Sequence, residues 1–189
     1  MTMQTRRSRP RSVTALFSVL FSVLMLLAPA RAAAAPPELR IISETELEFG
    51  TFAVIGSGYR IVGPDGSIQS TGIFSMSSSD TSPARFTIRY DRGNNGRRRL
   101  NLRIQLILAP APMVTQGNLV ARLSNYRTDI PGAANVSPGQ IVEVTIPNCR
   151  TRICSTSFRV GGRLDIQSNS GGGKIAIPIP AEIVLISVR

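Results

Sequence analysis

Apolar and polar residues alternate with a period of two along most of the chain after residue 40, and turn residues interrupt this alternation roughly every 8 to 14 positions. Successive side chains of a β-strand point to opposite faces, so this period is typical of strands with one buried face. Beyond the first 35 residues, no segment shows the period of an amphipathic helix. The pattern predicts an all-β sandwich or barrel built from antiparallel strands.

The clearest alternation covers residues 84–91 and 97–108. Phe86, Ile88 and Tyr90 alternate with polar residues in the first segment, and leucine or isoleucine does so in the second. The sequence Arg-Gly-Asn-Asn-Gly between them supplies residues that tolerate the positive φ angles of a hairpin connection. We expect these segments to form a β-hairpin with one face in the core and arginines on the other.

Residues 157–166 repeat this arrangement, because Phe158 and Val160 face one way while the neighbouring arginines face the other. An outer face rich in arginine could hold phosphate or carboxylate groups of a lipopolysaccharide, an acidic polysaccharide or a partner protein. The alternative is an ordinary solvated sheet face, which antiparallel sheets commonly have. The residues that form this candidate anionic-ligand face are Arg85, Arg89, Arg97, Arg99, Arg103, Arg159 and Arg163.

Residues 1–35 have the pattern of a signal peptide. Four arginines precede an apolar run at residues 13–27, and small residues follow with several A-x-A-like cleavage sites. The run is shorter than the roughly 18 residues that a membrane-spanning helix needs. We expect an exported protein, located in the periplasm, at the cell surface or outside the cell, with residues 36–189 as one domain and no membrane span in the mature chain.

Removal of the leader changes the charge balance. The full chain carries 22 basic and 11 acidic residues, and the leader contains five arginines and no acidic residue. The mature chain therefore has a net charge of about +6 (22 − 5 − 11), so its basicity is not a nucleic-acid signature. It has no tryptophan as a stacking platform, and we expect no nucleic-acid partner.

Three short motifs point to a family. They are Leu-Glu-Phe-Gly at residues 47–50, Ser-Pro-Ala-Arg-Phe-Thr-Ile at 82–88 and Phe-Arg-Val-Gly-Gly-Arg-Leu-Asp-Ile at 158–166. In order and separation they resemble an exported bacterial family catalogued as domain of unknown function 4402. The resemblance implies a single immunoglobulin-like β-sandwich, and the turn spacing of this chain indicates about eight or nine strands. Some members resemble subunits of surface fibres assembled by the chaperone-usher route. It implies no catalytic residues.

The chain contains no histidine, which removes the commonest general base and the commonest metal ligand. Ser-His-Asp and Cys-His catalysis are therefore excluded. The aspartates are scattered without the paired spacing of a two-carboxylate hydrolase. We expect a protein that is not an enzyme and that has no cofactor and no metal site.

Cys149 and Cys154 are the only cysteines. Two thiols without histidine supply only half of a tetrahedral zinc shell, and the spacing is not the C-x-x-C of a redox centre. In an oxidising compartment such a pair normally forms a disulfide, which is the expectation here. Free or intermolecular thiols are the main alternative.

The combined expectation is a structural or adhesive cell-envelope protein that resembles a fimbrial subunit and acts through strand-edge or face-to-face contacts. Its partners would be proteins such as a periplasmic chaperone or fibre subunits. A donor strand is hard to find, because little more than residues 36–43 precedes the first motif. The second hypothesis is a periplasmic or surface module that binds an anionic glycan or lipid through the arginine face.

Overall fold

The computed structural model describes residues 35–168 and 171–189. The expected signal peptide thus lies outside the described residues except for Ala35. Residues Ala35–Arg189 form one compact unit. The strands in the described part are β1 (Glu38–Thr45), β2 (Leu47–Val62), β3 (Ile68–Ser82), β4 (Ala84–Asp91), β5 (Leu100–Leu108), β6 (Val114–Gln116), β7 (Leu119–Thr128), β8 (Asn135–Val136), β9 (Ile141–Cys149), β10 (Ile153–Ser168), β11 (Gly171–Ile177) and β12 (Ala181–Val188).

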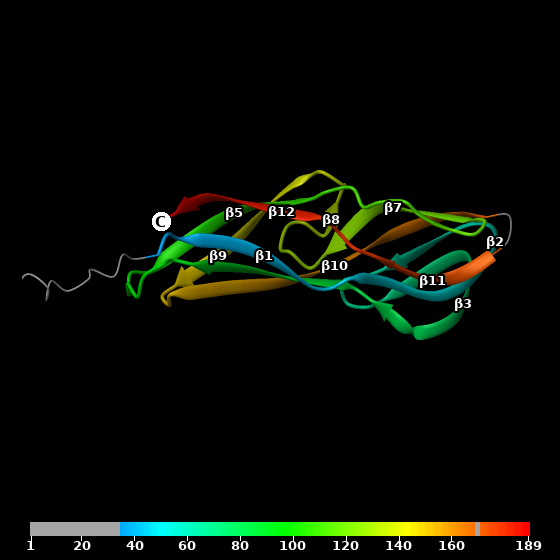
Figure 1. Ribbon diagram of the computed structural model, residues 1–189, viewed down its shortest axis with the longest axis horizontal. Coiled ribbons are helices and arrows are strands. Elements are labelled where there is room, and N and C mark those ends of the chain that lie inside the picture. The colour runs from blue at the N-terminus through cyan, green and yellow to red at the C-terminus, as the bar shows by residue number, and fades with distance from the viewer. Residues whose placement is uncertain (1–34, 169–170) are drawn as a thin grey trace, which may run out of the picture. The chain divides into compact units, whose positions relative to one another are not determined.

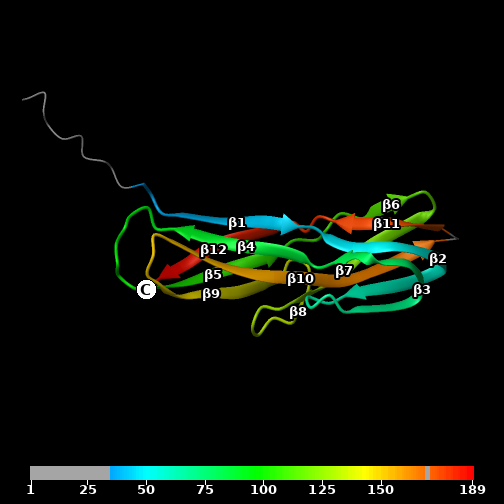
Figure 2. The ribbon, with the colours of Figure 1, turned by 90° about the horizontal axis from the view of Figure 1, so that it is seen from below.

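The strands build two sheets in which every pair is antiparallel (Figures 1 and 2). The smaller sheet has the order β12-β5-β9. The larger sheet follows the path β1-β4-β10-β2-β11, with β3 beside β2, β7 beside β10, and β6 and β8 beside β7. The all-β antiparallel prediction is confirmed. Twelve strands replace the expected eight or nine, partly because β6 and β8 have only three and two residues and leave no readable alternation.

Both sheets contribute to one apolar core. In β5 the leucines and isoleucine at alternate positions are buried, whereas Asn101 and Arg103 between them are exposed. Phe86 of β4 and Phe158 of β10 are register partners and stack with their ring centroids 5.5 Å apart. The period of two in the sequence therefore marks the core-facing positions, as in other β-sandwiches.

The predicted hairpin of residues 84–91 and 97–108 is wrong. β4 pairs with β1 and β10 in the larger sheet, while β5 pairs with β9 and β12 in the smaller one. Residues 92–99 cross from one sheet to the other, and the buried Arg92 donates to the carbonyl of Arg98 across this loop at 3.0 Å. Alternation fixes which face of a strand is buried, but it does not specify the neighbouring strand.

β2 has two parts with different partners. Residues Leu47–Val54 pair with β11, and Ser57–Val62 pair with β10. The change occurs at Ile55 and Gly56, and Gly56 has a φ of 93°, which L side chains rarely adopt. A glycine with positive φ inside a strand often marks a local bend, and here both partners belong to the same larger sheet.

Candidate functional site

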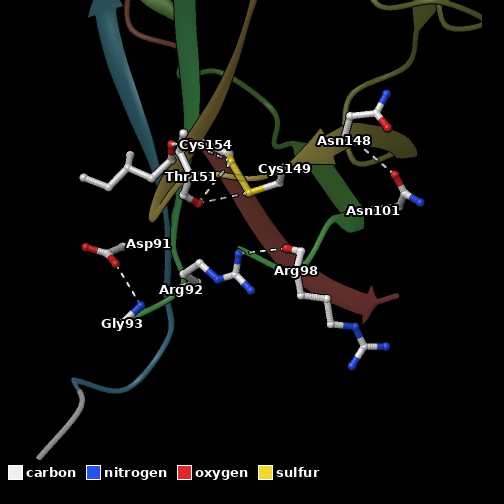
Figure 3. The surroundings of a disulfide bond; sticks show 10 residues. Asp91, Arg92, Gly93, Arg98, Asn101, Asn148, Cys149, Thr151 and Cys154 are labelled. Carbon is white, nitrogen blue, oxygen red and sulfur yellow. Dashed lines mark hydrogen bonds between the residues drawn. A yellow bond between two sulfur atoms is a disulfide. The ribbon is translucent and has the colours of Figure 1, made fainter. Parts of the chain in front are cut away.

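The cysteines form a disulfide, Cys149–Cys154, with Cα atoms 5.8 Å apart. Cys149 ends β9 in the smaller sheet, and Cys154 lies near the start of β10 in the larger sheet. The bond therefore joins the two sheets across the connection that links them (Figure 3). A disulfide agrees with an oxidising environment.

Asp91 connects the two loops at this end of the domain. Its Oδ1 accepts from the Gly93 N–H at 2.8 Å and from the Arg152 Nε at 3.1 Å. These bonds stabilise the carboxylate, so the Gly93 N–H first, and Arg152 second, lower the pKa of Asp91 below its usual value. Loop 92–99 and loop 150–152 are thus held together by one side chain.

The connection between β9 and β10 is also fixed by its backbone. Asn148 has a φ of 57°, a left-handed conformation that asparagine tolerates better than most residues. Its N–H donates to the Asn101 Oδ1 at 3.0 Å (Figure 3). The backbone of Asn101 in turn exchanges two hydrogen bonds with Arg189. The disulfide, the last described residue and both loops therefore meet at one end of the domain.

The arginines expected on one face are divided among several places. Arg85, Arg89 and Arg159 lie on the outer face of the larger sheet, where Arg85 and Arg159 are register partners on β4 and β10. Arg103 lies on the smaller sheet, where its Nη2 is 2.6 Å from the Glu143 Oε2. The prediction that Arg85, Arg89, Arg99 and Arg103 share one face, with Arg97 at the turn, is wrong, because β4 and β5 belong to different sheets and residues 97 and 99 lie in the loop between them.

The remaining arginines have separate surroundings. Arg163 lies in the second half of β10, 2.8 Å from the Asp165 Oδ1 and over the Tyr59 ring at 4.0 Å. Arg97 and Arg99 are exposed in the loop that follows β4. Of the seven candidates, the structure places only Arg85 and Arg159 directly side by side.

Arg85 and Arg159 share an open cleft on the outer face of the larger sheet. Its volume is about 510 Å³, and it also contains Glu44, Asp65 and Ser82. A second hollow of about 270 Å³ adjoins both arginines and Asp129. The Asp129 Oδ1 accepts from the Arg159 backbone N–H at 2.7 Å. The cleft therefore offers two guanidinium groups beside carboxylates that compensate part of their charge, since the Glu44 Oε2 lies 3.9 Å from the Arg85 Nε. It suits a polar ligand that carries hydrogen-bond donors as well as a negatively charged group.

Sequence reasoning missed Arg60, which lies on β2 and is fully buried. Its guanidinium is within hydrogen-bond distance of the Ser75 and Thr81 hydroxyls and 5.8 Å from the centre of the Phe52 ring. Desolvation lowers the pKa of Arg60 below the usual arginine value. Arg60 follows Tyr59 and precedes two apolar residues, so the sequence does not alternate there. The pattern therefore gave no sign that this arginine is buried.

The candidate face did not include four further arginines that lie at the disulfide end, Arg98, Arg150, Arg152 and Arg189. The signal was present, since Arg97-Arg98-Arg99 and Arg150-Thr151-Arg152 are the densest runs of positive charge after residue 35. What the sequence does not reveal is that the two runs meet.

In the described residues no three histidine, cysteine, aspartate or glutamate side chains gather as metal ligands would. The same residues hold no helix with the length and apolar character needed to cross a membrane.

The domain is thus an antiparallel β-sandwich with a cross-sheet disulfide at one end. Residues 39–183 match the model of the family described as "Domain of unknown function (DUF4402)", and the chain belongs to this family. The match confirms the resemblance seen in the three motifs. No curated protein and no solved structure matches the chain.

Proposed function

We propose that this protein is a non-enzymatic, exported component of the cell envelope, structural or adhesive in role and similar to a fimbrial subunit. The proposal rests mainly on the two terminal strands. β1 pairs only with β4 and β12 pairs only with β5 among the described strands, and the two lie near each other where the sheets meet (Figure 2). Each strand therefore has one backbone edge available to another chain.

The side chains of these strands support a contact of this kind. β12 carries Val184, Ile186 and Val188 as exposed apolar residues, with 53%, 49% and 41% of their surface accessible. Only Leu39 and Ile41 of β1 are half-buried, while its other residues are exposed. Edge strands of monomeric proteins usually carry charge or proline on such surfaces. The β12 edge lacks that protection over these three residues.

The test is the oligomeric state of the exported protein purified alone. We expect oligomers that grow with protein concentration in size-exclusion chromatography with light scattering. Substitution of Val184 and Ile186 by lysine should shift the population to monomer, because charges on an edge strand oppose strand addition.

The matched control is Ile141→Lys, on the outer face of β9 at the other edge of the same sheet and 57% exposed. It should leave the oligomers unchanged. A protein that stays monomeric at all concentrations and refolds reversibly contradicts the fibre-subunit proposal, as does an equal effect of both substitutions.

A second candidate function is binding of an anionic glycan or lipid in the cleft of Arg85 and Arg159. The adjacent guanidinium groups favour it, because arginine binds phosphate and carboxylate in a bidentate manner. Replacement of both arginines by glutamine should lower the salt needed to elute the protein from a lipopolysaccharide resin. Arg103→Gln, on the opposite sheet and paired with Glu143, is the control. Retention that does not respond to salt or to the double substitution would exclude this candidate.

A further inference from the structure

The disulfide end of the domain carries a dense group of arginines, here called the arginine end. Loop 92–99 follows β4, loop 150–152 joins β9 to β10, and the last residue after β12 lies beside them. Leu100 pairs with Cys149, and the Arg92 N–H donates to the Arg152 carbonyl at 3.0 Å, so the loops are neighbours. The exposed residues of the arginine end are Arg97, Arg98, Arg99, Arg150, Arg152 and Arg189.

The charge of the arginine end is largely uncompensated. Asp91 pairs with Arg152 at 3.1 Å, but none of the ion pairs among the described residues includes the other five arginines. The residues outside the described part contain no aspartate or glutamate that could neutralise them. Like charges on neighbouring loops repel one another, so the arrangement favours a partner with several negative groups.

Two sets of contacts fix the loops that carry the arginines, one within loop 92–99 and one between this loop and loop 150–152. The buried Arg92 donates to the Arg98 carbonyl at 3.0 Å, and the Asn94 Oδ1 accepts from the Gly96 N–H at 3.0 Å. The disulfide and Asp91 fix the second loop against the first. Figure 3 shows Arg92 and Arg98 beside the disulfide. Less conformational entropy is lost on binding when the charged groups stand on fixed loops.

We propose that the arginine end binds the phosphate groups of an anionic phospholipid surface. Guanidinium groups form bidentate hydrogen bonds with phosphate, and each arginine near an anionic bilayer adds to the attraction. These arginines lie on protruding loops and outside the cleft of Arg85 and Arg159, which suits an extended surface of many phosphates better than one enclosed ligand. Arg85 lies six residues from Asp91 along β4, or about 20 Å, so the two surfaces are distinct.

The path of the chain supports a lipid surface over other polyanions. The domain begins at Ala35, which lies next to Gly93 at the arginine end. The two residues are so close that a Cβ on Gly93 would overlap the Ala35 carbonyl. Residues 28–34 separate Ala35 from the apolar run of the expected signal peptide and span at most about 25 Å when extended. While that leader is attached to a membrane, the short segment limits how far the arginine end can lie from lipid headgroups. The inference thus rests on the proposed export.

The test is binding of the exported protein to vesicles. We expect it to sediment with vesicles of phosphatidylglycerol and phosphatidylcholine, to be released as salt rises, and to ignore pure phosphatidylcholine. Substitution of Arg97, Arg98 and Arg99 by glutamine should weaken binding at least about tenfold. Arg150→Gln, on the second loop, should weaken it further. These side chains are exposed, so circular dichroism should show an unchanged fold.

The control variant removes the same charge elsewhere, through glutamine at Arg103, Arg122 and Lys174, and should change the affinity less than about twofold. Equal losses from the control variant and the loop variant would overturn the proposal, because net charge alone would then explain binding. Release by inorganic phosphate but not by chloride at the same ionic strength would also overturn it in favour of a single phosphate site. A protein found in the periplasm or medium that ignores anionic vesicles even at low salt refutes this inference and leaves the envelope role intact.

Discussion

At the scale of single residues, the interior of the sandwich contains a few polar groups whose partners are specific. Tyr126 of β7 is fully buried, and its hydroxyl donates to the Ala109 carbonyl at 2.6 Å. Burial in apolar surroundings disfavours the phenolate and raises the pKa of Tyr126 to about 12. The side chain anchors the segment after β5 to the larger sheet.

The first prediction concerns alkaline pH. The folded pKa of Tyr126 lies above the unfolded value of about 10, so its contribution to stability is complete below pH 10 and is lost as pH rises towards 12. The free energy of unfolding should fall by up to about 3 kcal/mol over this interval. Urea denaturation at a series of pH values measures the change.

Tyr126→Phe is the control for this pH effect. It leaves the Ala109 carbonyl without its partner and should cost about 1–3 kcal/mol at neutral pH. The variant should also lose the part of the alkaline dependence that comes from this phenol. An unchanged dependence between pH 10 and 12 would contradict the assignment.

At the scale of elements, β2 shows how one strand serves two partners. Its bend brings Gly58 against β3 so closely that a Cβ there would lie 2.5 Å from the Thr71 carbonyl oxygen. Backbone cannot move aside as a flexible side chain can, so this position requires glycine. The tight contact explains the glycine at position 58, whereas the φ of 93° explains the other glycine of this segment, Gly56.

The second prediction follows from this contact. Gly58→Ala should destabilise the fold by about 1–3 kcal/mol through steric overlap, measured as a lower urea midpoint with an unchanged slope. Gly173→Ala is the matched control, because its Cβ would meet only the flexible Gln116 side chain. It should cost less than Gly58→Ala. Equal costs would mean that the backbone contact is not what limits position 58.

At the scale of the whole molecule, the disulfide and the apolar core contribute differently to the stability of the fold. One apolar cluster spans both sheets and supplies most of the stability, since burial of apolar surface dominates folding. The disulfide joins the sheets at one end and closes a loop with a sequence separation of only 5. Short loops lose little entropy when they close, so the bond should secure this end without determining the fold.

The third prediction tests whether the disulfide stabilises this end of the domain without determining the fold. Replacement of Cys149 and Cys154 by serine should lower the free energy of unfolding by about 2 kcal/mol and leave the β-sheet circular dichroism spectrum intact. The same variant should loosen the arginine end, measured as faster amide exchange at residues 150–152. Native protein in which both cysteines react with a thiol reagent would show that the bond is absent.

The faces of the strands could be predicted from the sequence because a one-residue shift exposes every core side chain. In 84–91, 100–108 and 157–166 the apolar positions are the buried ones. The disulfide could also be predicted, since the two cysteines of a chain with a signal-peptide pattern are expected to pair. The partners of each strand could not be predicted, because the alternating segment 97–108 could bury its apolar face as part of either sheet.

The sequence by itself determined the all-β class, the family, the buried face of most strands and the cysteine pair, because each depends on residues close together in the chain. Only the tertiary structure decided that β4 and β5 lie in opposite sheets, that Arg60 is buried, and that the arginines are divided among several surfaces. Those facts depend on which distant segments meet. That choice comes from packing across the core and from the length of the crossing loop at 92–99, which a local pattern does not record.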